Sequence, residues 1–171
     1  MRLKDVTIEE ARKFLSTRPP ADTKYYDIDA DREIRTAEFI SGVWMEGELV
    51  GVGGVALSYW LFHHTFYMVC EKARGKGYGK QLQKANFDYI RANGVPFLVQ
   101  TIVKGNEAAK TLHEHGGSKI IYETKDSYHL VKVFNTWGKI VSPFIPLMLR
   151  VFYSPIGRAV AKYKSNPSLG F

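Results

Sequence analysis

The sequence contains a single cysteine and no long apolar run. With Cys70 alone, no disulfide framework can form within the chain, and a reducing cytoplasm is the expected location. No apolar run reaches the roughly 18 residues that cross a bilayer, and the first residues lack the apolar core of a signal peptide. Apolar residues still make up 45% of the chain, which is enough to build a core and excludes a wholly disordered protein.

Acidic residues are missing from the C-terminal part of the chain. Residues 135–171 hold five lysines and arginines and no acid, whereas residues 1–134 hold 19 cationic and 17 acidic residues. The net charge of +7 therefore lies mostly in the C-terminal segment, which shows no nucleic-acid recognition motif, and nucleic acid is not the expected partner. We predict one domain over residues 1–134 and a C-terminal extension over residues 135–171.

Helical and strand patterns alternate along the predicted domain. A capping box formed by Thr7 and Glu10 predicts a helix that ends near Thr17. Strands are predicted over residues 39–45, 49–57, 60–70, 96–103, 118–123 and 127–134. A helix between the third and fourth of these strands should end at Asn93-Gly94 and bury a face made of Tyr78, Leu82, Ala85 and Tyr89.

A glycine-rich basic segment, Arg74-Gly75-Lys76-Gly77-Tyr78-Gly79-Lys80, separates an apolar run over residues 66–70 from that helix. Glycines let backbone N–H groups approach a ligand closely. A helix start adds unpaired N–H donors and the positive end of the helix dipole. With three basic side chains beside it, this turn predicts an anion site whose natural ligand is a diphosphate.

Two common phosphate-binding motifs do not fit this segment. The nucleoside-triphosphate loop ends in Lys-Ser or Lys-Thr, and neither follows these glycines. The dinucleotide fingerprint G-x-G-x-x-G needs one more residue between its last two glycines than Gly77 and Gly79 leave. Residues 74–79 instead match R/Q-x-x-G-x-G/A at each fixed position, and so the segment resembles the GCN5-related N-acetyltransferase (GNAT) superfamily.

A second segment is similar to the same family. Its pattern N-x-x-A-x-x-L-Y-x-x-x-G is matched by Asn106, Ala109, Leu112 and Gly116 or Gly117. His113 stands where the family usually has tyrosine. The two motifs follow the family's order and separation, and the resemblance covers residues 1–134.

The resemblance implies an α/β fold with a mixed, mostly antiparallel central sheet flanked by helices. In this family two neighbouring strands splay apart, and the pantetheine arm of acetyl-CoA lies between them. The strand before the glycine loop would pair with pantetheine through its backbone, and the loop would hold the pyrophosphate. The implied cofactor-binding residues are Met68, Val69, Cys70, Arg74, Gly75, Lys76, Gly77, Tyr78, Gly79, Lys80 and Asn106.

The implied catalytic residues are two histidines. His113 replaces the tyrosine that protonates the leaving thiolate. For the base that deprotonates the amine, strand alternation places His63 on the same face as Val69, at the spacing that several family members use, and His64 on the opposite face. Other candidates for the base are Glu38, Glu46 and Tyr128.

The resemblance implies an N-acyltransferase that moves an acetyl group from acetyl-CoA to a primary amine of a small molecule or protein. The amine would attack the thioester directly, and no metal would be required. The alternative is a non-catalytic interaction or assembly protein that keeps the same fold and docks through its apolar tail.

The C-terminal extension has no counterpart in the minimal family domain. Residues 140–153 are strongly apolar but are interrupted by Pro143 and Pro146, so they are not expected to form one long helix. An apolar stretch in water must be covered. We expect residues 138–164 to pack on their own domain, on a second copy or on another protein, and contact with a membrane surface is the third alternative.

Overall fold

The computed structural model of the chain describes residues 3–17, 30–57 and 62–154. Its strands are β1 (Leu3–Asp5), β2 (Ala37–Met45), β3 (Glu48–Leu57), β4 (His63–Val69), β5 (Phe97–Val103), β6 (Lys119–Glu123) and β7 (Ser127–Val133). Its α-helices are α1 (Ile8–Ser16), α3 (Ala30–Arg35), α4 (Tyr78–Ala92), α5 (Glu107–His115), α6 (Thr136–Val141) and α7 (Ile145–Tyr153). Two short 3₁₀-helices are η1 (Glu71–Ala73) and η2 (Ser142–Phe144). The first residues of the strand predicted over 60–70 lie outside the described residues.

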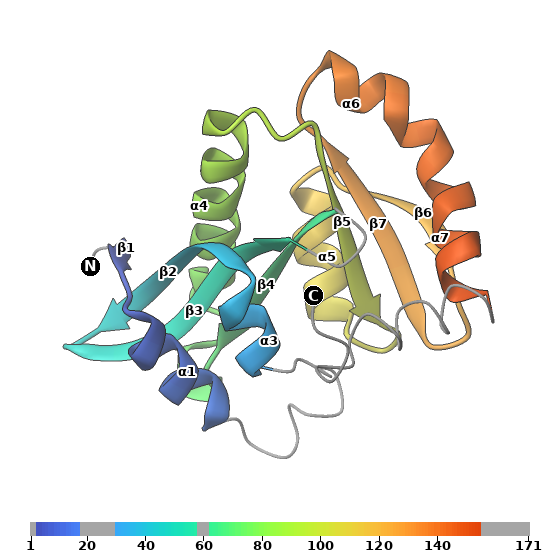
Figure 1. The fold of residues 1–171 in the computed structure, drawn as a ribbon. Coiled ribbons are helices and arrows are strands. Elements are labelled where there is room, and N and C mark those ends of the chain that lie inside the picture. The colour runs from blue at the N-terminus through green and yellow to red at the C-terminus, as the bar shows by residue number, and fades with distance from the viewer. Residues whose placement is uncertain (1–2, 18–29, 58–61, 155–171) are drawn as a thin grey trace, which may run out of the picture.

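The strands form two sheets, shown side by side in Figure 1. The first has the order β1-β2-β3-β4 and the second β5-β7-β6, and the ladders within both are antiparallel. β4 and β5 are neighbours, yet no backbone ladder joins them within the described residues. The fold class implied by the resemblance is confirmed, since antiparallel sheets are flanked by helices.

Local sequence signals account for the start of α1 and for the β2–β3 turn. Thr7 is the N-cap of α1, and the predicted capping box with Glu10 is present. The turn between β2 and β3 contains Glu46 and Gly47, whose φ angles are 53° and 84°. Positive φ at both central residues suits a two-residue hairpin, because such a turn follows the twist of the strands.

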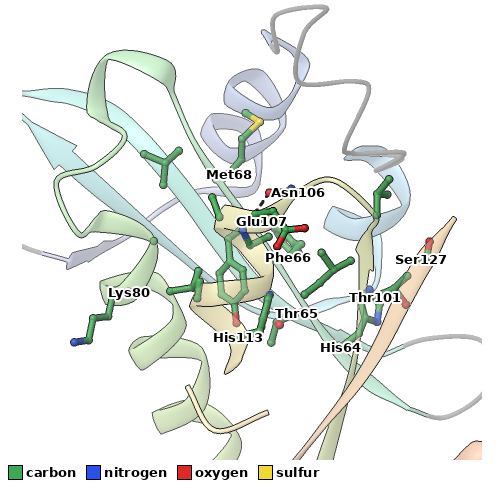
Figure 2. Close-up of a pocket in the computed structure, with 18 of the residues that line it drawn as sticks. His64, Thr65, Phe66, Met68, Lys80, Thr101, Asn106, Glu107, His113 and Ser127 are labelled. Carbon is green, nitrogen blue, oxygen red and sulfur yellow. Dashed lines mark hydrogen bonds between the residues drawn. The ribbon is translucent and has the colours of Figure 1, made fainter. Parts of the chain in front are cut away.

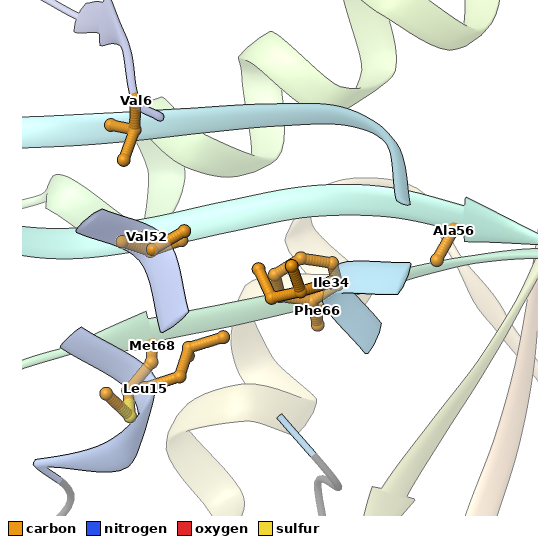
Figure 3. Close-up of a cluster of buried hydrophobic side chains, with 8 residues drawn as sticks. Val6, Leu15, Ile34, Val52, Ala56, Phe66 and Met68 are labelled. Carbon is orange, nitrogen blue, oxygen red and sulfur yellow. The ribbon is translucent and has the colours of Figure 1, made fainter. Parts of the chain in front are cut away.

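Hydrophobic clusters lie on both faces of the first sheet. On one face, α1 and α3 cover a cluster that includes Leu15, Ile34 and Phe66 (Figure 3). On the other face α4 buries Tyr78, Leu82, Phe87 and Ile90. Of the four residues predicted to form the buried face of α4, only Tyr78 and Leu82 are therefore buried.

Polar residues explain the error on α4. Ala85 and Tyr89 are only half-buried, whereas Asn86 is fully buried. Its side-chain Nδ2 donates to the Gly54 carbonyl oxygen at 2.8 Å. A buried amide with a backbone partner interrupts the apolar periodicity from which the face was predicted.

The C-terminal extension packs on the second sheet. α6, η2 and α7 form a broken helical run along the outer side of β6 and β7 (Figure 1). Ile145 and Leu149 are buried against Val99 and Val131 of the sheet. One of the three expected arrangements, packing on its own domain, is thus present on one face of the run. Of the helices described, none is long and apolar enough to cross a membrane.

Candidate active site

A large cavity opens where β4 and β5 separate. Its volume is about 1070 Å³, and its walls come from β4, the loop after it, the start of α4, β5, α5 and α7 (Figure 2). β4 pairs with β3 and β5 pairs with β7, so within the described residues the facing edges of β4 and β5 have no strand partner. Backbone N–H and C=O groups on such edges are available to an extended ligand that carries its own amides.

Side chains, rather than backbone groups, connect the two strands. Gln100 of β5 donates from Nε2 to Thr65 Oγ1 of β4 at 3.2 Å and accepts from Ser118 Oγ at 2.7 Å. Gln100 is 2% exposed, so these bonds satisfy an amide that would otherwise be costly to bury. They link β4 to β5 without closing the backbone edges.

The glycine-rich loop contributes a wall with the geometry of an anion site. Gly75 and Gly77 have φ angles of 74° and 81°, and Gly77 is the residue from which α4 begins. A Cβ atom added at either glycine would meet nothing within 4 Å, so the space in front of them is open. The first turn of α4 contains no acid, and the exposed Lys80 lies in it. Helix-end N–H groups and a lysine together favour a bound phosphate.

Asn106 and His113 are brought to the cavity by α5. Asn106 caps the helix, as predicted, by accepting from the Ala109 N–H at 3.1 Å. His113 is buried, and its ring centroid lies 5.4 Å from that of Tyr67. Burial lowers the pKa of His113 to about 4, so its imidazole is neutral at physiological pH. A neutral imidazole can donate a hydrogen bond but cannot act as a cationic acid.

His64 of β4 lies in the cavity wall with Glu33 of α3. The His64 Nε2 atom is 2.7 Å from Glu33 Oε2, and the carboxylate side chain of Glu33 is almost completely buried. An ionised carboxylate only accepts hydrogen bonds, so this contact places the imidazole proton on Nε2. In the neutral ring Nδ1 then carries the lone pair; this atom is buried and has no hydrogen-bond partner among the residues described.

His63, in contrast, is not part of the cavity wall. Its Nε2 atom is 3.0 Å from Glu38 Oε2, on the other face of β4. His63 and His64 lie on opposite faces of β4, as strand alternation predicts. The cavity lies at the open edge of β4, and so residues from both faces of the strand line it. The residue named from the sequence as the base, His63, therefore lies outside the cavity wall, whereas His64 lies in it.

Two residues that were expected to bind the cofactor, Cys70 and Lys76, are also not part of the cavity wall. The Cys70 N–H donates to the Val50 carbonyl at 2.9 Å, and its carbonyl accepts from Ala73. Lys76 Nζ lies 3.7 Å from Met45 Sδ. The remaining expected residues do line the cavity: Met68, Val69, Arg74, Gly75, Gly77, Tyr78, Gly79, Lys80, Asn106 and His113.

Several lining residues have no signal in the sequence. The Glu33–His64 pair joins residues 31 positions apart, on different elements of the chain. From α7, Leu149 and Tyr153 enter the wall, and the Tyr153 ring lies 4.8 Å from that of His129. The extension therefore completes the cavity as well as packing on the sheet.

The cavity combines a glycine loop at a helix start, an open strand edge and a carboxylate–imidazole pair. Such a set can hold an extended phosphate-bearing ligand and accept a proton from a nucleophile beside it. Within the described part of the chain, no group of three or more His, Cys, Asp or Glu side chains could hold a metal ion.

Comparison with known proteins points to one family. A model of the acetyltransferase (GNAT) family matches residues 4–117. No curated protein sequence matches the chain.

Solved structures share the fold at low sequence identity. An acetyltransferase of the GNAT family from Streptococcus pneumoniae is 16% identical, with a TM-score of 0.62 over 78% of this chain and 99% of that one. A ribosomal-protein-alanine N-acetyltransferase from Brucella melitensis is also 16% identical, with a TM-score of 0.62 over 78% of this chain and 100% of that one. A putative acetyltransferase from Salmonella typhimurium, solved with its cofactor acetyl-CoA, is 14% identical, with a TM-score of 0.62 over 79% and 94% of the two chains.

Proposed function

The chain belongs to the GNAT family of acetyltransferases, and we propose that it transfers the acetyl group of acetyl-CoA to a primary amine. The observation that carries this proposal is the glycine loop, which meets the open edge of β4 in the wall of one cavity. A cytoplasmic location stays a prediction.

Acetyl-CoA would bind along the separated strands. The loop N–H groups and Lys80 would hold the pyrophosphate, while the free edge of β4 at Met68 and Val69 would pair with the amides of pantetheine. Asn106 would contact the same arm from the start of α5. The similar fold of the Salmonella typhimurium protein, solved with acetyl-CoA, supports this cofactor.

The base in this proposal is His64, held by Glu33. The Glu33 carboxylate would fix the imidazole tautomer and stabilise the imidazolium that forms when Nδ1 takes a proton from the amine. Because Nδ1 is buried, the side chains that cover it would have to move for the amine to reach it. The neutral amine then attacks the thioester carbon, the new C–N bond forms and the C–S bond breaks. The nitrogen releases its second proton to solvent as the amide forms. A buried carboxylate near the acceptor site also favours an acceptor that arrives as a cation.

The leaving thiolate would be stabilised by His113. Because this imidazole is neutral, it would donate a hydrogen bond to the sulfur while the thiolate takes its proton from solvent. Proximity of the amine to the thioester supplies much of the remaining acceleration.

Release of the CoA thiol in the presence of a panel of amines tests the proposal. We expect an amine-dependent rate that falls about 10²-fold or more in His64→Gln, which keeps a polar side chain but removes the base. His63→Gln, on the other face of the strand, should change the rate by less than about twofold, because its side chain lies outside the cavity wall. The reverse pattern would assign the base to His63. Binding of acetyl-CoA without transfer to any amine would favour the non-catalytic alternative.

A further inference from the structure

The C-terminal extension presents an apolar stripe to solvent. Among the described residues seven large apolar side chains are exposed, and six of them lie between Trp137 and Val151. These six, called here the outer stripe, are Trp137, Ile140, Phe144, Leu147, Met148 and Val151. Their spacing of three and four residues places them on one side of the helical run.

The opposite side of the run is already occupied. Ile145 and Leu149 are buried against the second sheet, and Gly138 lies so close to Pro96 that an added Cβ would be 2.1 Å from its carbonyl oxygen. The run is therefore fixed to the domain, and the outer stripe points away from it. This amount of exposed apolar surface on one element marks an interaction site.

The charge of the extension indicates what covers the stripe. Lys139 of α6 and Arg150 of α7 are both exposed, so the run that carries the stripe also presents two positive charges to solvent. In sequence, residues 135–171 carry five basic residues and no acid. Two copies that met through this stripe would bring these like charges together with no acid of the extension to offset them. An anionic surface would instead neutralise these positive charges directly.

We propose that the outer stripe docks on the surface of an anionic phospholipid bilayer. The run would lie in the plane of the interface, with its apolar side chains among the acyl chains and its basic side chains at the phosphates. Trp137, at one end of the stripe, is a residue type that favours this boundary. Leu149 and Tyr153 of α7 line the cavity, so the helix that would meet the lipid also forms part of the cavity wall.

Co-sedimentation of the full chain with lipid vesicles tests the proposal. We expect binding to phosphatidylcholine vesicles that contain about a third phosphatidylglycerol, with affinity at least about tenfold higher than for phosphatidylcholine alone and reduced by salt. Leu147→Glu, at a side chain that is 62% exposed, should weaken binding about tenfold or more. Ile8→Glu is the matched control, because Ile8 is 57% exposed but lies on α1. This variant should bind vesicles like the unmodified chain.

Three results would overturn the proposal. The first is no sedimentation with anionic vesicles, and the second is equal binding by Leu147→Glu and the unmodified chain. The third is a dimer, found by analytical ultracentrifugation, that Leu147→Glu converts to a monomer, since this result would assign the stripe to a second copy. Thermal unfolding of each variant verifies that the exposed substitutions leave the fold intact.

Discussion

The buried His113 makes a specific contribution to the pH dependence of stability. Its pKa is lowered by burial from 6.5 to about 4. The unfolded chain therefore takes up a proton near pH 6.5, whereas the folded chain stays neutral until about pH 4. Above about pH 6.5 the histidine is unprotonated in both states and makes no contribution to the pH dependence of the unfolding free energy. As the pH falls from about 6.5 towards 4, the unfolded state alone binds the proton, and the folded state loses stability.

The size of this loss follows from the two pKa values. A pH of 5 lies about 1.5 pH units below the pKa of the unfolded histidine, whereas the folded histidine is still mostly neutral at this pH. The resulting loss of unfolding free energy is about 2 kcal/mol. His113→Phe removes the titrating group and keeps a ring at the same place. The decrease in unfolding free energy between pH 7 and pH 5 should be about 2 kcal/mol smaller in this variant, whatever its stability at pH 7. His129, whose pKa burial also lowers to about 4, retains its own contribution in both proteins.

Urea denaturation at the two pH values measures this difference. His115→Phe is the matched control, because His115 lies on the same helix but is exposed. This variant should follow the unmodified protein to within about 0.5 kcal/mol. If His113→Phe showed the full pH dependence of the unmodified protein, the pKa of His113 would not be lowered on folding. The burial of an uncharged imidazole at this place in the cavity wall would then be wrong.

Two further predictions concern the C-terminal extension. Ile145→Ala should lower the unfolding free energy by about 2–5 kcal/mol, because Ile145 is fully buried, whereas Leu147→Ala, on the exposed side of the same helix, should change it by less than about 0.5 kcal/mol. Urea denaturation compares the two, and equal effects would contradict the packing of α7. Gly138→Ala should cost about 1–3 kcal/mol, because its Cβ would lie 2.1 Å from the Pro96 carbonyl oxygen. A thermal midpoint unchanged from that of the unmodified protein would show that α6 does not approach Pro96 so closely.

Local signals made most of the fold predictable from the sequence. The capping box at Thr7, the cap at Asn106 and the glycine-rich turn before α4 act over a few residues, and each lies where it was predicted. The glycine-loop end of the candidate site follows from the same signals, because a strand, a glycine turn and a helix start are consecutive in the chain.

The Glu33–His64 side of the cavity could not be predicted, because it depends on contacts between distant segments. Glu33 meets His64 only after α3 has packed on the sheet, and no spacing rule connects them. Strand alternation correctly separates His63 from His64 but does not say which face meets a cavity at an open strand edge. Leu149 and Tyr153 reach the cavity through the packing of α7, which depends on the whole second sheet.

Calorimetric titration with acetyl-CoA tests the central claim, that the glycine loop is the pyrophosphate site. Gly77→Ala and Gly47→Ala form a matched pair, since the two glycines have φ angles of 81° and 84° and open space around the added Cβ. Both substitutions cost a similar backbone strain of about 1–2 kcal/mol, but only Gly77 lines the cavity. We expect salt-sensitive binding by the unmodified chain and by Gly47→Ala, and binding at least about tenfold weaker in Gly77→Ala. Equal affinity in the two variants, or no binding by the unmodified chain, would contradict this claim.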